Sequence, residues 1–272
     1  MKNTLFILLL ITLFASCETV VTDVEIPEVS RKTVVELAMG NLTSTYKASL
    51  TKSNPIFNSR PGEFEVIADA TLVVSGNGIS DTFLYDVSNA VYTSRKNYNF
   101  APGQIYELNI KTKDGNSVSS KAAYPVAATG IETKVDSVVQ FGETIYRFHV
   151  KWDDQLGVND YYQLECYTVF EYEPGLTDTI FGGFYREYVG PDDIINSNYV
   201  ADGEFYKYEG GGVNDVKVFI VISGISEEHY KYGRVLEKYN PDNPFSEPTL
   251  IPTNIEGGLG MFVLKNSVVT EL

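Results

Sequence analysis

The feature that most constrains this fold is a period-two alternation of apolar and polar residues, which begins at Lys32 and continues to Tyr124. A strand that buries one face has this period, and glycine-containing turns at 76–78 and 114–116 interrupt it. We expect strands at residues 32–38, 44–52, 67–75, 82–86, 91–98, 105–113 and 117–124. Short strands separated by such turns predict an immunoglobulin-like or prealbumin-like sandwich over residues 32–125.

A second series of strands follows the small residues at 126–130. We expect these strands at residues 131–139, 144–152, 161–172, 177–189, 199–208, 216–223 and 259–269. The stretch 216–223 is almost continuously apolar, which indicates burial on both faces. The chain has 272 residues and 43% of them are apolar, enough for two medium-sized cores. The sequence thus predicts an all-β protein of two tandem β-sandwich domains, at residues 32–125 and 131–272.

One helix is expected in the second domain, at residues 226–240. Ser226 is a good N-cap residue, and the proline at 241 ends the helical pattern. Gly233 lies inside this helix at a cost of about 1 kcal/mol relative to alanine, so we expect the helix to approach a sheet closely there. The face that we expect to be buried consists of Tyr232, Val235, Leu236 and Tyr239.

A long proline- and glycine-rich segment follows the helix, and we expect it to pack on the second sandwich. Its prolines lower the entropy lost on ordering, which suits a lid over the sandwich. Long loops on a rigid scaffold also bind partners, so both interpretations stay open. The candidate interaction residues are Pro244, Phe245, Asn254, Gly257 and Phe262.

Residues 1–16 are typical of a secretory signal peptide. The apolar run at 5–14 is shorter than the ~20 residues that a membrane-spanning helix needs, and small residues precede Cys17. The Phe-Ala-Ser-Cys sequence at 14–17 resembles the lipobox of bacterial lipoproteins, which implies that Cys17 becomes the acylated first residue of the mature protein. Residues 17–31 then form a lipidated N-terminus and tether. Ordinary cleavage near Ala15, which leaves a free thiol, is the alternative.

Cysteine use agrees with such an anchor. The chain has two cysteines, and acylation of Cys17 leaves Cys166 without a partner for a disulfide. Cys166 alternates in phase with Leu164 and Phe170. We therefore expect it on the buried face of a strand, as a small core hydrophobe.

The sequence carries none of the common catalytic motifs, such as G-x-S-x-G, H-E-x-x-H or a phosphate-binding glycine loop. It has two histidines, and we expect both at the surface: His149 on a strand and His229 in the first turn of the helix. We therefore predict a protein that is not an enzyme and has no cofactor. Zinc would need both histidines to converge with a carboxylate. The oxygen-rich residues Asp153, Asp154 and Asp160 could bind Ca²⁺, although their spacing is not that of an EF-hand.

Composition limits the partners. The net charge of −15 argues against nucleic acid and against adhesion to anionic lipid. The chain is also rich in tyrosine, with 19 residues. Exposed tyrosines at 161–172 and aromatic residues at 184–188 are candidate stacking platforms for a glycan or a peptide.

Several short motifs, in this order, make the chain similar to the DUF4249 family of Bacteroidota outer-membrane lipoproteins. They are Cys17 followed by Glu18, Val-Val-Glu at 34–36, Asp-Ala-Thr-Leu at 69–72, Pro-Gly-Gln-Ile-Tyr-Glu-Leu at 102–108, Tyr-Pro at 124–125, and Asn-Pro-Phe with the Asn- and Gly-rich element near the C-terminus. The resemblance implies a tandem β lipoprotein of the outer membrane, often encoded near TonB-dependent transporters. It carries over no catalytic residue, and the family's proline pair at the domain junction is reduced here to Pro125.

These observations predict a non-catalytic lipoprotein that is anchored in the outer membrane and faces the cell surface. We expect it to be an accessory subunit of a TonB-dependent, SusC-like transporter or of a larger outer-membrane complex, with a β-barrel protein as its partner. The alternative is a surface lipoprotein that captures a glycan or a peptide.

Mass spectrometry of the mature protein tests the predicted anchor. We expect its first residue to be Cys17 carrying acyl chains, because the lipobox-like sequence ends there and two or more chains anchor a protein stably. An unmodified product that is secreted freely would contradict this prediction.

Overall fold

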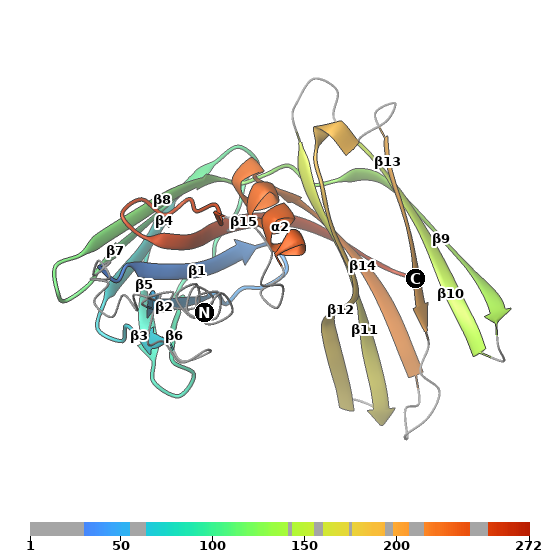
Figure 1. Cartoon of the computed structure of the whole chain (residues 1–272), viewed down its shortest axis with the longest axis horizontal. Helices are drawn as coiled ribbons and strands as arrows, with labels where there is room; N and C mark the ends of the chain where they lie inside the picture. The colour runs from blue at the N-terminus through green and yellow to red at the C-terminus, as the bar shows by residue number, and fades with distance from the viewer. Residues whose placement is uncertain are drawn as a thin grey trace, which may run out of the picture. The chain divides into compact units, whose positions relative to one another are not determined.

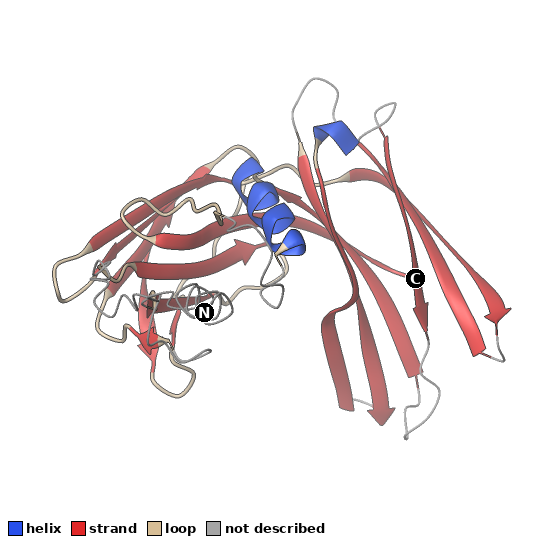
Figure 2. Ribbon diagram, viewed as in Figure 1, coloured by secondary structure: helices blue, strands red, loops and turns tan. Residues whose placement is uncertain are grey.

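The computed structural model describes residues 30–54, 64–140, 143–154, 160–173, 176–193, 198–206, 215–239 and 250–272. Within this part the chain is mostly strand, with one α-helix and one short 3-10 helix at Pro191–Asp193 (Figure 2). Residues Arg31–Leu272 form one compact unit. The predicted signal peptide, Cys17 and nearly all of the tether lie outside the described residues.

The first sandwich has strands close to those that the sequence predicts. They are β1 (Thr33–Gly40), β2 (Lys47–Lys52), β3 (Glu65–Val66), β4 (Thr71–Gly76), β5 (Ile79–Asp86), β6 (Val91–Thr93), β7 (Ile105–Lys111) and β8 (Ser117–Ala123). The strand predicted at 91–98 ends early, at Thr93. Its continuation leaves the sheet because the carboxylate of Asp81 accepts the backbone N–H groups of Arg95 and Lys96, both at 3.0 Å.

β5 joins the two layers of this sandwich. Its residues Leu84–Asp86 pair with β6, in the layer β1-β2-β6, and its residues up to Phe83 pair with β4, in the layer β4-β7-β8 (Figure 1). The core between the layers includes the fully buried Leu37, Leu72 and Tyr106. The prediction of a β-sandwich is confirmed.

The second sandwich has a similar construction. Its strands are β9 (Thr129–Gln140), β10 (Glu143–Asp153), β11 (Tyr161–Glu173), β12 (Leu176–Val189), β13 (Asn198–Tyr206), β14 (Asp215–Ile225) and β15 (Leu259–Glu271). The sheet β13-β10-β9 and the strands β12-β11-β14 share a core around Trp152, Tyr162 and Ile220. Residues 220–225 of β14 are all buried, as the apolar run predicts.

β15 belongs to both sandwiches. Its first half, Leu259–Lys265, runs parallel to β1, and its second half, from Asn266, runs antiparallel to β14. Its residues Phe262 and Leu264 lie in the core of the first sandwich. The division at 125–131 therefore stays a prediction, and one strand crosses it.

The helix α2 (Glu227–Lys238) begins as predicted, because the Ser226 hydroxyl accepts the backbone N–H of His229 at 3.3 Å. α2 packs against β11 and β12. A Cβ at Gly233 would overlap the ring of Tyr188, so the predicted close approach is confirmed.

The buried face predicted for α2 is only partly right: Tyr232 and Val235 are half-buried, but the other two residues are exposed. His229 and Gly233, one turn apart, face the protein, whereas Leu236 is 40% and Tyr239 is 48% exposed. The reason is steric: the ring of Tyr188 occupies the helix–sheet contact and leaves room only for a glycine. The helix must present Gly233 there, which turns Leu236 and Tyr239 outward.

The described part of the proline- and glycine-rich segment, from residue 250 onward, packs on the first sandwich and not on the second as predicted. Among its described residues, Ile255 lies in the first core, and Glu256 forms an antiparallel bridge with Ser119 of β8. Backbone pairing with β8 is available to the segment because β8 lies at the end of its sheet. Of the described helices, none is long and apolar enough to cross a membrane.

Substitution at Gly260 tests how closely β15 and β1 approach. Gly260 has φ +100°, and a Cβ there would overlap the carbonyl oxygen of Val35. We expect Gly260→Ala to lower the free energy of unfolding by about 2–4 kcal/mol in urea titrations. Gly78→Ala is the matched control, because Gly78 also has positive φ (+76°) but open space around it, and it should cost about 1 kcal/mol. Equal losses in the two variants would contradict this packing.

Candidate interaction sites

Asn254 acts as a structural clamp on β15. Its Nδ2 donates to the carbonyl of Phe262 at 2.7 Å, and its Oδ1 accepts the backbone N–H of Phe262 at 2.9 Å. The side-chain amide thus takes the place of a neighbouring strand at this residue. Thr253 supports the same turn, because its hydroxyl donates to the carbonyl of Gly260 at 2.7 Å. The Asn254 amide is therefore committed inside the protein.

The other predicted interaction residues divide into three groups. Phe262 has no exposed surface, so its side chain fills the first core and does not present itself to a partner. Gly257 is exposed and has φ +76°, which suits a turn that only glycine adopts easily. Pro244 and Phe245 lie outside the described residues. The described part of the segment is a lid on the first sandwich, and docking through it stays a prediction.

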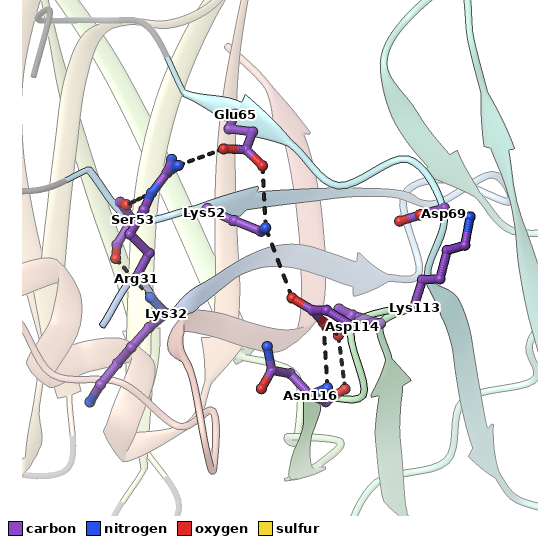
Figure 3. Close-up of polar contacts among 10 residues, drawn as sticks. Arg31, Lys32, Lys52, Ser53, Glu65, Asp69, Lys113, Asp114 and Asn116 are labelled. Atoms are coloured by element: carbon purple, nitrogen blue, oxygen red, sulfur yellow. Dashed lines mark hydrogen bonds and ion pairs between the residues drawn. The ribbon is translucent and has the colours of Figure 1, made fainter. Parts of the chain in front are cut away.

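The tether enters the folded unit through a set of charged contacts (Figure 3). Arg31 forms an ion pair with Glu65 and donates from Nε to the carbonyl of Ser53 at 2.8 Å. Lys52 lies between Glu65, at 3.3 Å, and Asp114, at 3.9 Å. The hydrogen bonds from Arg31 and then Lys52 hold the pKa of Glu65 below its usual value. These contacts fix where the folded body begins.

Large apolar side chains are exposed on both sides of residues 240–249. They are Leu236 and Tyr239 at the end of α2, Leu250, which is 90% exposed, and Ile251, which is 40% exposed. We call these four the flanking residues. In the sequence they lie on either side of the segment that contains Pro244 and Phe245. The sequence pattern predicted that Leu236 and Tyr239 are buried.

The two histidines occupy different environments. His149 is exposed on β10 and its Nδ1 lies 2.7 Å from the carboxylate of Asp202, so the surface prediction is confirmed. The surface prediction for His229 is wrong. His229 is buried against the ring of Tyr188, and its Nδ1 has no hydrogen-bond partner in the part of the chain that the structure describes. The turn of α2 that places Gly233 against the sheet also brings in His229, four residues earlier.

Cys166 is a core residue, as predicted. It is completely buried among the residues of the second core, and burial raises the pKa of its thiol to about 12. A thiol in this environment stays protonated and poorly reactive.

The predicted Ca²⁺ ligands find no support. Asp154 accepts the hydroxyl of Tyr162 at 3.4 Å, and burial, followed by the charge of Asp154, raises the pKa of Asp160. Among the described residues, no group of three or more His, Cys, Asp or Glu side chains is placed to hold a metal ion. Residues 155–159, between Asp154 and Asp160, lie outside the described residues.

The predicted tyrosine platforms are largely internal. Tyr162 and Tyr188 are buried, Tyr161 packs on Tyr230 with ring centres 5.1 Å apart, and Tyr167 stacks on Phe219 at 5.2 Å. These rings stabilise the second sandwich. As surface platforms, Tyr162 and Tyr188 are wrong predictions.

Sequence reasoning missed a pocket at one end of the first sandwich. It has a volume of about 500 Å³ and is lined by residues 40–44 and 46, residues 97–100 and 102, Tyr124 and Asn266. The alternation of the asparagines at 97 and 99 with Tyr98 and Phe100 is the one sequence pattern that could have indicated a binding site here. Their convergence with Asn266 was not visible, because that residue lies near the other end of the chain.

Comparison with known proteins identifies a family. The family model described as "Domain of unknown function (DUF4249)" matches residues 21–271. A comparison with curated proteins finds no match. Among solved structures, the crystal structure of chicken CNTN1 FN1-FN3 domains is similar over 71% of this chain, with 16% sequence identity and a TM-score of 0.27. The chain covers 60% of that structure.

His229 makes stability depend on pH. Burial, followed by the charges of Lys265 and Arg186, lowers the pKa of His229 from 6.5 to about 3. Between these values the unfolded chain binds a proton that the folded chain does not, so stability falls as pH drops below 6.5, by up to about 1.4 kcal/mol per pH unit. We expect His229→Leu to remove this contribution between pH 7 and 5 in urea unfolding.

The matched control is Ser226→Ala, which removes the cap of the same helix but no group that titrates between pH 7 and 5. This variant should keep the wild-type pH dependence. An unchanged slope in His229→Leu would show that His229 is not the buried neutral group described above.

Proposed function

Because this chain belongs to the DUF4249 family, whose function is not known, we propose a function from its own residues. It is a non-catalytic outer-membrane lipoprotein that faces the cell exterior and docks onto a β-barrel protein, such as a SusC-like TonB-dependent transporter or a larger outer-membrane complex. The exposure of the flanking residues is the observation that carries this proposal.

The exposed end of α2 supports a docking surface. Amphipathic helices normally bury their most apolar side, but here a histidine and a glycine face the sheet while Leu236 and Tyr239 face outward. Leu250 and Ile251 add two exposed apolar side chains on the other side of the same segment. Exposed apolar groups of this kind mark interaction surfaces when they gather. A tyrosine among them matches the residue types enriched in interfaces.

The anchor supports a membrane-bound partner. A tether from Cys17 to Arg31 spans at most about 50 Å when fully extended. The contacts of Arg31 with Glu65 and Ser53 fix the folded end of the tether. An acylated Cys17 would then keep the folded body near the bilayer. The net charge of −15 disfavours adhesion of the body to anionic headgroups, which leaves a protein as the better partner.

The groups best suited to catalysis have structural roles. The Cys166 thiol is buried with a raised pKa, His229 is buried against Tyr188, and the Nδ1 of His149 lies 2.7 Å from the carboxylate of Asp202 at the surface. These environments favour a non-enzymatic role.

Co-purification tests the proposal. Full-length protein carrying an affinity tag is isolated from the detergent-solubilised membranes of its own cells, and the co-purifying proteins are identified by mass spectrometry. We expect a β-barrel protein in stoichiometric amounts, and we expect the variant Leu236→Ser with Tyr239→Ser to lose it, because two apolar contacts become polar.

The control is Val87→Ser, which changes an apolar residue that is 82% exposed on the first sandwich. It should keep the partner, and Cys17→Ser should lose membrane attachment. Recovery of the wild-type protein without any β-barrel partner would overturn the proposal, as would retention of the partner by the double variant.

A further inference from the structure

We infer that the pocket at the end of the first sandwich, lined by Tyr98, Phe100 and the amides of Asn97 and Asn99, binds a neutral, hydroxyl-rich ligand of the saccharide class. This inference does not rest on the proposed docking function, because the pocket and the flanking residues share no side chain. It replaces the tyrosines predicted as stacking platforms with a different site.

The size of the pocket suits a small ligand. Its volume of about 500 Å³ lies within the range of about 300–1,000 Å³ that is typical of small-molecule sites. It is open to solvent, because Leu42, Asn97, Asn99 and Pro102 are all exposed. A sugar unit at the end of a longer chain can therefore enter while the rest of the chain stays outside.

The lining carries no charged side chain. In this protein 21% of the residues are charged, yet every residue that lines the pocket is neutral. Phosphate and carboxylate ligands are usually held by arginine or lysine, and cationic ligands by carboxylates. A neutral ligand is the one that this lining matches.

Two side-chain amides are available for hydrogen bonds. Asn97 and Asn99 are exposed, and neither side chain has a hydrogen-bond partner among the described residues. An amide offers a donor and an acceptor side by side, which matches adjacent hydroxyl groups of a sugar. Asn266 also lines the pocket, and its Nδ2 donates to the carbonyl of Pro125 at 3.0 Å.

Aromatic carbon forms the apolar part of the wall. Phe100 lies between Tyr98 and Tyr124 in a stack, with ring centres 5.7 Å and 4.7 Å apart. Tyr98 and Phe100 are half-buried, and both line the pocket. Aromatic rings beside amides provide both an apolar surface for C–H groups and polar groups for hydroxyls.

The walls are held in place before any ligand arrives. The carbonyl oxygens of Gly40 and Thr43 share the single hydroxyl proton of Tyr46, at 2.8 and 2.6 Å, and this contact fixes the β1–β2 connection. The carbonyl of Asn99 accepts from the Asn77 amide at 2.9 Å and from the Tyr106 hydroxyl at 3.2 Å. The ligand therefore binds to an ordered site, which reduces the entropy lost on binding.

A peptide fits this pocket less well. Proteins often bind an extended peptide by adding it to a free strand edge, where backbone N–H and C=O groups are unpaired. The walls here are mainly two connections, and the strands β1 and β15 contribute only Gly40, which pairs with Lys265, and Asn266, which pairs with Gly224.

The test begins with the purified full-length protein in a detergent that has no sugar headgroup, so that the detergent does not compete. The labelled protein is applied to an array of neutral glycans, acidic glycans and short peptides. The best neutral oligosaccharide is then titrated by calorimetry, because the single tryptophan, Trp152, is buried in the second core and does not report on this pocket.

We expect saturable binding of a neutral oligosaccharide. Asn97→Ala and Asn99→Ala should each weaken it about fivefold to tenfold, since each removes hydrogen bonds to the ligand. The matched control Asn109→Ala changes an exposed asparagine on β7, outside the pocket, and should leave the affinity unchanged. All three variants should keep the wild-type melting temperature.

Three outcomes would overturn the inference. They are the absence of any binding to neutral glycans, equal or tighter binding of acidic glycans or peptides, and binding that Asn97→Ala and Asn99→Ala leave unchanged. None of these results would affect co-purification with a β-barrel protein, so the two proposals fail separately.

Discussion

The parallel pairing of β1 with β15 is the interaction on which the rest of this structure depends. It joins the first strand of the folded unit to the last, and Phe262 and Leu264 of β15 fill the core of the first sandwich. Closing a loop of about 200 residues costs about 5 kcal/mol of chain entropy. Burying two large apolar side chains stabilises the fold by about 3–6 kcal/mol, which is similar to the free energy lost in closing the loop. The first sandwich is therefore complete only when the whole chain has folded, which agrees with one compact unit over Arg31–Leu272.

Two asparagines complete β15 where its neighbouring strands stop. Asn254 pairs with both backbone groups of Phe262, and Asn41 pairs in the same way with Ser267, with both distances 2.8 Å. The second clamp lies just past the end of β1, where β15 leaves that strand and pairs with β14. A side-chain amide can imitate a strand edge at a single residue, which lets a strand change partners without leaving buried backbone groups unpaired.

Local pattern predicted most elements, and long-range packing decided the rest. The period-two alternation located strands such as β1, β7 and β8 to within a few residues, and Ser226 located the start of α2. The orientation of α2 could not be predicted from its own sequence, because the ring of Tyr188 on β12 sets it. The burial of His229 follows from that orientation. The parallel partner of β1 was also hidden, since nothing near either strand in sequence indicates the pairing.

The pocket and the junction between the sandwiches meet at the same point of β15. Asn266 lines the pocket, donates to the carbonyl of Pro125 in the connection between the sandwiches, and pairs with Gly224 of β14. Gly224 in turn has no room for a side chain, because the carbonyl of Val126 lies against it. The pocket wall, the interdomain connection and the most buried strand of the second sandwich therefore share one set of contacts. Local sequence patterns did not indicate the pocket because Asn266, which β15 contributes to its wall, lies far in sequence from the other lining residues.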